Sequence, residues 1–445
     1  MKLEGLTERD IVQEHVIDLL EKDQYRGTFI AGTGFGKSRV IVKTLLRMVT
    51  QIKVNKILIL VPFDHLKDRF KDEFCKILGV RKGRLFVKKF IDLQCYASIP
   101  KLDPLDYNRI ICDEIHLGLT EKCESFYQKA RTGGVRMIFC TATVPEDGRM
   151  RMIMTNMAPI RFTITLDECV ERGFVSSYTI ECVALNLTDG EREQYETVNK
   201  NFVYWKSKLV ECSTEEPDGL LKLLNPQATV YVDAFSEANK IVGKKGQFTA
   251  EQYRAAAGFF RAIKQRKGLI DHAVNKIQMA KIYGAITKKK GGRMLVFGGD
   301  NQFTNRIAKE LPGSVVYHSK LGVKVRRSSL QAFRDGSAWV LCSTKALNQG
   351  LDVPDADTGL ICGLTSKTNT MIQRIGRLVR IDPNNPDKCG VIKILYVENS
   401  QEQKWLENAL KTVSTKRIKW TDAKEFLDSL NSKKKRKPRP KQPKP

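Results

Sequence analysis

The residues of this chain best suited to chemistry lie near its N-terminus, where glycines alternate with other residues just before a lysine and a serine. Gly32, Gly34 and Gly36 allow successive backbone amides to turn inward around a phosphate group. Lys37 can meet the β and γ oxygens of a nucleoside triphosphate, and Ser38 can reach a bound magnesium ion. Because an apolar run precedes these residues and a helix-like segment follows them, they predict a phosphate-binding loop at a helix N-terminus.

A pair of carboxylates follows a second apolar run further along the chain. Residues 109–112 predict a buried strand that ends at Asp113 and Glu114. The carboxyl ends of the strands are where α/β sheets place their ligands. We expect Asp113 to hold magnesium, directly or through water, and Glu114 to orient and deprotonate an attacking water molecule. With the loop that contains Thr33, this pair predicts ATP hydrolysis.

Length and composition are those of a large globular protein. The chain has 445 residues, of which 42% are hydrophobic, so we expect two domains of ordinary size and an appendage. We find no uncharged run long enough to span a membrane and no secretion signal, so we expect a protein that is not exported and lies in the cytoplasm or elsewhere inside the cell. The cysteines are scattered singly, which predicts reduced surroundings and gives no indication of zinc.

The charge of the chain is strongly positive. Lys and Arg number 76 against 50 Asp and Glu, which gives a formal net charge of +26. A polyanion is the natural partner of such a surface, because each neutralised phosphate releases counterions. Residues 431–445 are basic and rich in proline, and we expect a disordered tail there that contributes to nucleic-acid binding or serves only solubility or localisation.

The order of apolar runs predicts an α/β fold with two parallel sheets. Strand-like runs at residues 56–61 and 136–140 alternate with helical spacing such as that at residues 65–78. A long, polar and mostly helical stretch follows, and strand signals then resume. We therefore predict four parts, namely a first, ATP-binding domain at 1–178, a helical connecting region at 179–290, a second domain at 291–430 and the tail at 431–445.

The second domain carries no phosphate loop but has two groups of polar residues. Arg377 and Arg380 stand three residues apart, on one face of a predicted helix. They could stabilise a transferring γ-phosphoryl group from across a cleft, or they could form a basic helix that faces solvent or DNA. Residues 343–352 follow a predicted strand and suit contacts to nucleic-acid phosphates, with Asp352 placed to bind a ribose hydroxyl or an arginine.

In their order along the chain, these motifs resemble those of superfamily 2 helicases and translocases. The matching segments are residues 31–38, 60–62, 113–116, 141–143, 295–297, 344–352 and 373–380. The resemblance implies two RecA-like domains with ATP and Mg²⁺ in the cleft between them, and a nucleic-acid strand that crosses both. Loss of activity with retained DNA binding is the expected result of Lys37→Ala or Glu114→Gln.

The resemblance also assigns expected roles to individual residues. It implies that His116, Thr141 and Thr143 couple hydrolysis to domain movement and that Gln373 faces the γ-phosphate. Gln13 is either the glutamine that contacts adenine or a surface residue. The residues expected to contact nucleic acid are Gly298, Gly299, Thr344, Gly350 and Asp352.

Departures from the common pattern indicate a subgroup. Residues 113–116 read Asp-Glu-Ile-His and not Asp-Glu-Ala-Asp, which points away from the DEAD-box RNA helicases. The chain looks most like phage and viral DNA helicases of the UvsW type and the motor subunits of restriction enzymes. We therefore expect a motor, acting as a monomer, that unwinds or branch-migrates single-stranded or branched DNA in replication, recombination or repair. An RNA helicase and an ATP-gated nucleic-acid clamp are the alternatives.

Overall fold

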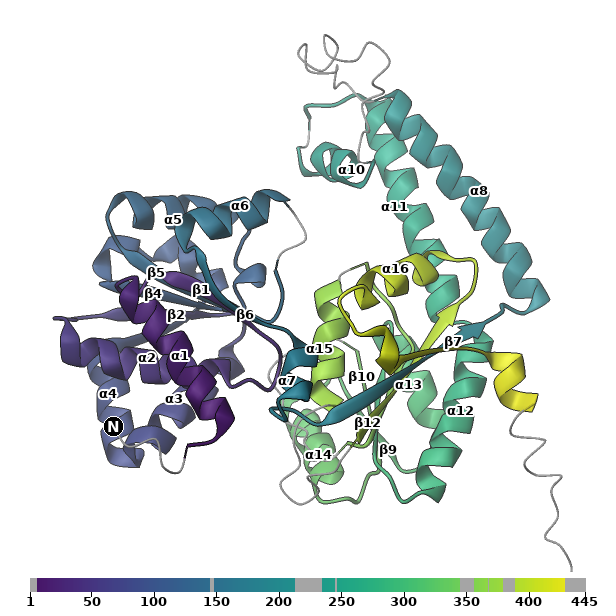
Figure 1. Ribbon diagram of the computed structural model, residues 1–445. Helices are drawn as coiled ribbons and strands as arrows, with labels where there is room; N and C mark the ends of the chain where they lie inside the picture. The colour runs from purple at the N-terminus through teal and green to yellow at the C-terminus, as the bar shows by residue number, and fades with distance from the viewer. Residues whose placement is uncertain are drawn as a thin grey trace, which may run out of the picture.

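The computed structural model describes residues 6–144, 148–212, 234–244, 246–344, 356–366, 368–378 and 389–428. These residues form two β-sheets, each flanked by helices, that lie side by side (Figure 1). The strand pairings within the described residues are parallel in both sheets. The predicted fold class, two tandem α/β domains with parallel sheets, is confirmed.

The first sheet has six strands in the order β3-β2-β4-β5-β1-β6. Its strands are β1 Gly27–Ala31, β2 Ile57–Val61, β3 Ile91–Cys95, β4 Arg109–Asp113, β5 Arg136–Thr141 and β6 Ile160–Ile164. Its helices are α1 Glu8–Lys22, α2 Lys37–Gln51, α3 Asp64–Leu78, α4 Val80–Phe90, α5 Glu121–Thr132, α6 Gly148–Met157 and α7 Leu166–Glu171, with short 3₁₀ turns η1 Tyr96–Lys101, η2 Pro104–Asp106 and η3 Ile115–Leu117. β1 and β2 are buried along their whole length, as expected for a parallel sheet covered on both faces.

The second sheet has seven strands in the order β13-β7-β12-β11-β8-β10-β9. Its strands are β7 Ser177–Leu185, β8 Met294–Phe297, β9 Ser314–Tyr317, β10 Val340–Ser343, β11 Thr358–Ile361, β12 Cys389–Val397 and β13 Ile418–Asp422. Its helices are α12 Val274–Lys289, α13 Asn301–Glu310, α14 Val323–Arg334, α15 Thr368–Leu378 and α16 Gln401–Leu410, with the 3₁₀ turn η5 Thr415–Arg417.

Two elements of the predicted connecting region belong to the second sheet. Strand β7 pairs with β12 and β13, so the predicted boundary between residues 178 and 179 falls inside a strand of the second domain. Helix α12 contributes Ile277, Ala280 and Tyr283 to a core that also contains Val296 from β8. We therefore propose that the second domain begins near residue 177 and carries a helical insertion.

That insertion is an arm of three helices, α8 Asp189–Glu211, α10 Ala234–Gly243 and α11 Ala250–Asp271. Figure 1 shows it extending away from the second sheet. The arm has a small apolar core of its own, in which Leu209, Ile241 and Phe259 are buried. The residues from 213 to 233, between α8 and α10, lie outside the described residues.

Local signals in the sequence explain where several of these helices begin. Thr188 caps α8 by accepting from the amide of Glu191, whose carboxylate in turn accepts from the Thr188 amide. Thr249 and Gln252 form the same reciprocal pair at the start of α11. Such capping boxes satisfy backbone donors that the first helical turn leaves unpaired. Within the described part of the chain, each helix is too short or too polar to cross a membrane.

Candidate nucleotide site between the two domains

The predicted phosphate-binding loop connects β1 to α2. Ala31 ends the strand and Lys37 begins the helix, so the loop amides lie at a helix N-terminus, where the helix dipole favours an anion. Gly36 has φ +97°, and a Cβ atom there would come within 2.5 Å of Nε2 of Gln13. The position therefore requires glycine for both its backbone conformation and its close packing.

Lys37, which follows this loop, contacts the carboxylate of Glu114, the predicted base for ATP hydrolysis. Nζ of Lys37 lies 3.3 Å from Oε1 of Glu114 and donates to the carbonyl oxygen of Ala31 at 3.2 Å. Glu114 directly follows β4, and β5 lies between β4 and β1 in the sheet. Strands β1, β4 and β5, which end at Ala31, Asp113 and Thr141, are therefore adjacent, and the motifs at their carboxyl ends meet.

The two carboxylates of this site have different electrostatic surroundings. Asp113 is buried and accepts from Sγ of Cys140 at 3.0 Å. Burial, and then the negative charge of Glu114, raises the pKa of Asp113. Burial also acts to raise the pKa of Glu114, but the positive charges of Lys37 and His116 outweigh it and lower that pKa. Glu114 is thus held ionised, whereas Asp113 is a buried carboxylate that a neighbouring cation would stabilise.

A short chain of polar contacts joins the ends of β4 and β5. Nδ1 of His116 lies 2.8 Å from Oγ1 of Thr141 and 3.5 Å from Oε2 of Glu114. Oγ1 of Thr141 in turn donates to the carbonyl oxygen of Thr143 at 2.9 Å. The structure therefore brings together His116, Thr141 and Thr143 beside Glu114, whose own backbone lies in the left-handed region with φ 49°.

Gln13 is buried beside the phosphate-binding loop and does not lie at the surface. Its side chain is 1% exposed, and Nε2 donates to the carbonyl oxygen of Phe35 at 2.6 Å. The alternative that Gln13 is a surface residue is therefore wrong. It lines a cavity of about 600 Å³ beside Gly36 and Ser38, which Phe174 also borders. Its Oε1 atom is buried without a hydrogen-bond partner, an arrangement that fits a ligand with a donor group.

The second domain reaches this site through α15. A Cβ atom at Gly376 would lie 1.6 Å from Oγ1 of Thr33, so this helix packs directly on the phosphate-binding loop. Gln373 and Arg377 lie on the same helix, and both are partly buried. Arg380 lies outside the described residues, so its expected position opposite the loop stays a prediction.

Arg374, which the sequence analysis did not single out, is the most buried arginine of α15. Its guanidinium group donates to the carbonyl oxygen of Gly363 at 2.5 Å and lies 5.3 Å from the ring centroid of Phe297. Burial lowers the pKa of Arg374 to about 10. Ile372 and Ile375, which flank Arg374, are also buried. These apolar neighbours are the sequence signal that could have indicated that Arg374 faces inward.

Three consecutive carbonyl groups after β11 each accept from a different basic side chain. Lys276 of α12 donates to Cys362 at 2.8 Å, Arg374 donates to Gly363, and Lys267 of α11 donates to Leu364 at 3.3 Å. Lys276 also forms a fully buried ion pair with Glu402 of α16, at 2.8 Å. We call this set the carbonyl clamp. It connects the base of the helical arm to the loop that leads into α15.

The residues expected to contact nucleic acid lie at the carboxyl ends of β8 and β10, as far as they are described. Gly298 and Gly299 follow β8, and a Cβ atom at Gly299 would lie 2.5 Å from the carboxyl carbon of Asp271. Oγ1 of Thr344 lies 3.0 Å from Oδ1 of Asn301. Close packing inside the domain therefore explains why glycine occupies these two positions. Gly350 and Asp352 lie outside the described residues.

Comparisons with known proteins agree with this arrangement. Residues 7–146 match the family described as Type III restriction enzyme, res subunit, and residues 276–382 match the Helicase conserved C-terminal domain. The chain is 25% identical over 362 residues to the DNA 3'-5' translocase XPB2 of Sulfurisphaera tokodaii, across 80% of this chain and 75% of that protein.

Two solved structures show the same fold. The helicase domain of Pyrococcus furiosus Hef superposes with a TM-score of 0.52 at 17% identity, over 91% of this chain and 99% of that one. S. cerevisiae Dbp5 bound to RNA and ADP BeF3 gives a TM-score of 0.54 at 14% identity, over 98% and 94% of the two chains.

The strand order and these structural neighbours define a protein with two RecA-like domains. The two domain matches and the translocase relative show that the protein is an ATP-dependent helicase, similar to those of superfamily 2.

Proposed function

We propose that this protein hydrolyses ATP in the cleft between its two domains and uses the energy to move along DNA. The observation that carries the proposal is the continuous set of contacts from Lys37 through Glu114 and His116 to Thr141. These groups come from the ends of β1, β4 and β5, and α15 of the other domain packs on the same loop. A site made by two domains changes when they move relative to each other.

In this proposal the first domain supplies the chemistry. The loop amides at Gly34 and Gly36 and the side chain of Lys37 bind the phosphates of ATP. Glu114, which its cationic neighbours hold ionised, orients the attacking water and accepts its proton. Ser38 and Asp113 would hold magnesium.

The buried carboxylate of Asp113 fits such a magnesium ion, because a cation would offset the cost of its burial. In the part of the chain that the structure describes, no cluster of three or more His, Cys, Asp or Glu side chains could hold a metal ion by itself, so the phosphates would complete the coordination. When bound, magnesium would neutralise charge on the phosphate oxygens.

The second domain supplies the groups that complete the site. Gln373, Arg377 and Arg380 are proposed to reach the γ-phosphate from α15 and the residues after it. His116, Thr141 and Thr143 would pass the change at Glu114 to the end of β5, because they contact one another there.

DNA is the proposed polymer, and RNA is the second candidate. The relative matched over most of this chain is named as a DNA translocase, whereas one of the solved structures with the same fold is bound to RNA. We propose that Gly298, Gly299, Thr344, Gly350 and Asp352 contact the backbone of the strand. Contacts of that kind carry little sequence information.

The finer parts of the proposal concern the biological setting. A role in unwinding or branch-migrating DNA during replication, recombination or repair follows from the resemblance to UvsW-type and restriction-enzyme motors stated above. We also propose that the protein acts as a monomer inside the cell.

The rate of ATP hydrolysis with different polymers tests this function. Turnover should be stimulated most by single-stranded or branched DNA, compared with RNA of equal length. Lys37→Ala should abolish turnover and retain DNA binding, because it removes the cation that meets the phosphates. Lys43→Ala is the matched control, since Lys43 lies on the same helix but pairs with Glu14.

Each other outcome has a defined meaning. Stronger stimulation by RNA would replace DNA with RNA as the polymer. Equal basal rates with every polymer, together with binding that depends on ATP, would favour the clamp and overturn the proposed motor. A strand-separation assay on forks and four-way junctions then shows whether turnover is used for unwinding.

A further inference from the structure

Helix α4 carries an unusual concentration of positive charge on the first domain. Its eleven residues, Val80–Phe90, contain no acidic side chain. They include five basic side chains, all of them exposed, at Arg81, Lys82, Arg84, Lys88 and Lys89. The helix leads directly into β3, the edge strand farthest from β6 in the sheet. In Figure 1 it lies at the lower left, on the side of the first domain away from the second.

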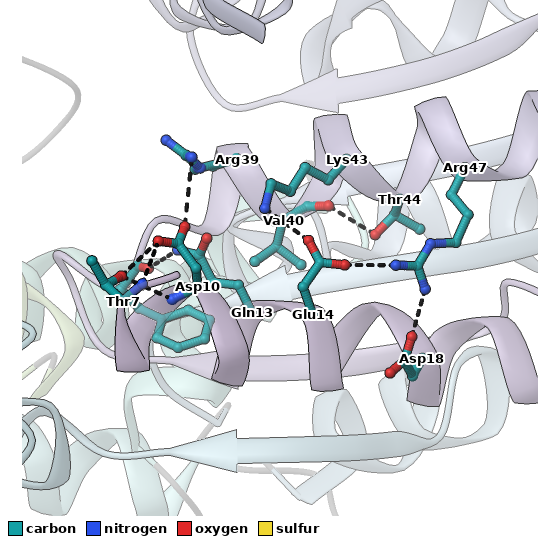
Figure 2. A network of polar contacts seen from close by, with 11 residues as sticks. Thr7, Asp10, Gln13, Glu14, Asp18, Arg39, Val40, Lys43, Thr44 and Arg47 are labelled. Atoms are coloured by element: carbon teal, nitrogen blue, oxygen red, sulfur yellow. Dashed lines mark hydrogen bonds and ion pairs between the residues drawn. The ribbon is translucent and has the colours of Figure 1, made fainter. Parts of the chain in front are cut away.

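These charges are not neutralised by carboxylates in the part of the chain that the structure describes. Among the described residues, no carboxylate forms an ion pair with any of the five side chains. Helix α2 of the same domain is the opposite case. Figure 2 shows Lys43 paired with Glu14 at 2.7 Å, and Arg47 paired with both Glu14 at 2.6 Å and Asp18 at 2.5 Å. The bases of α2 are therefore used inside the fold, whereas those of α4 remain available to a partner.

Helix stability gives a reason for Lys88 and Lys89, which lie in the last turn of α4, but not for the bases near its start. Arg81, Lys82 and Arg84 lie in or next to its first turn, where the helix dipole disfavours cations, and there is no acidic residue in that turn. The pairs Arg81 with Arg84 and Arg84 with Lys88 stand three and four residues apart, a spacing at which like charges repel. The cations near the start of α4 therefore lower the stability of the helix, which indicates that they have a role outside the fold.

The packing of α4 holds this charged face in a fixed position. Gly83 is buried, and a Cβ atom there would lie 2.7 Å from Cα of Cys75 and 2.8 Å from the carbonyl carbon of Phe74. Phe86 of α4 stacks on Phe74 of α3, with ring centroids 5.2 Å apart. Because one face is closely packed on α3, the basic face points to solvent as a rigid unit.

We propose that α4 is a second contact surface for nucleic acid, which binds the phosphate backbone of duplex DNA outside the cleft between the two domains. Arg81, Arg84 and Lys88 form a row roughly 10 Å long. Such a row spans about three phosphates of one strand of B-DNA. The proposal rests on the proposed function only in its choice of DNA as the polymer. Charge complementarity and the class of enzyme favour DNA over an acidic protein or a lipid surface.

The test is a triple substitution in the full-length protein, Arg81→Gln, Arg84→Gln and Lys88→Gln, which removes the row. Duplex DNA affinity should fall, and the slope of log K against log salt should become shallower by up to about 2.7, at 0.9 for each phosphate contact. The thermal midpoint should change little, because two of the removed cations lie near the helix N-terminus, where the dipole disfavours them, and one lies in the last turn, where it favours them. ATP turnover without DNA should not change, since α4 lies outside the nucleotide site.

A control with the same loss of charge is Lys43→Gln, Arg47→Gln and Arg161→Gln. These side chains pair with Glu14, Asp18 and Asp23, so the salt slope should not change and the thermal midpoint should fall slightly. Equal loss of DNA affinity in both triple variants would show an effect of net charge alone and overturn the proposal.

Two further outcomes separate this inference from others. Unchanged DNA binding in the α4 variant, with reduced binding to anionic lipid vesicles or to polyglutamate, would overturn the proposal in favour of those partners. In the other outcome, no polymer stimulates ATP turnover of the parent protein, but the α4 variant still has a shallower slope of log K for DNA against log salt. That result would support the contact surface and contradict the proposed motor function.

Discussion

The two sides of the nucleotide site are built in different ways. On the first domain, Glu114 at the end of β4 contacts both Lys37 and His116. On the second domain, Arg374 of α15 is bonded to its own domain, and Gly376 meets the other domain by shape alone. The comparison teaches that the groups of the first domain are in contact before any nucleotide binds, whereas the groups proposed for the second domain depend on how α15 is positioned against the loop.

The largest effect is expected from the preassembled side. Glu114→Gln should lower the rate constant of ATP hydrolysis by about 10³-fold, because it removes a general base and keeps the side-chain volume. Single-turnover quenched-flow measurements should show the same loss of hydrolysis rate with and without DNA, and DNA binding should be retained. Turnover at the parent rate would show that Glu114 is not the base.

A smaller effect is expected from the side that acts by position. Gly376→Ala would place a methyl group against Thr33 of the opposite domain. Misplacement of this kind should lower turnover with DNA by the order of 10-fold to 10²-fold. Nucleotide binding to the first domain, measured by fluorescence titration, should change little.

The matched control for this variant is Gly190→Ala on the helical arm. An added Cβ atom at Gly190 meets nothing within 4 Å, and alanine favours helix. Full activity of Gly376→Ala would mean that the two domains do not approach each other there during turnover, and the comparison between the two sides would break.

The smallest effect is expected at the edge of the site. Gln13→Ala removes the donor to the carbonyl oxygen of Phe35 and the unpaired Oε1 atom beside the cavity. The KM for ATP should rise about 5- to 10-fold, since a hydrogen bond contributes roughly 1 kcal/mol. The kcat should change little. Gln128→Ala, at an exposed position of α5, is the control, and a change in kcat alone would assign Gln13 to the chemistry instead.

Much of the site was predictable because its signals are local. The run that ends at Ala31 and the run that ends at Asp113 are strands in the structure, and both are followed by the residues that the motifs required. The predicted strand at residues 136–140 and the predicted helix at residues 65–78 are also present, as β5 and α3. Apolar periodicity and turn residues carry this information within a few positions.

What could not be predicted depends on contacts between distant segments. The apolar run of β7 is typical of a strand, but its partner β12 begins more than two hundred residues later. The sequence therefore does not indicate which sheet this strand joins. The burial of Arg374 and the ion pair between Lys276 and Glu402 depend on how three helices meet at one loop. Arginine and lysine are mostly exposed, so sequence reasoning places such side chains at the surface by default.

The carbonyl clamp has a consequence for how force would pass through the molecule. Lys267 fixes the base of the helical arm to Leu364, and Arg374 fixes α15 to the neighbouring carbonyl of Gly363. Part of a torque on the arm would therefore act on the backbone segment that also holds α15 in place against the phosphate-binding loop. A load on the far end of the arm would thus have two routes, one through these carbonyl groups to α15 and the other into β7, which leads directly into α8.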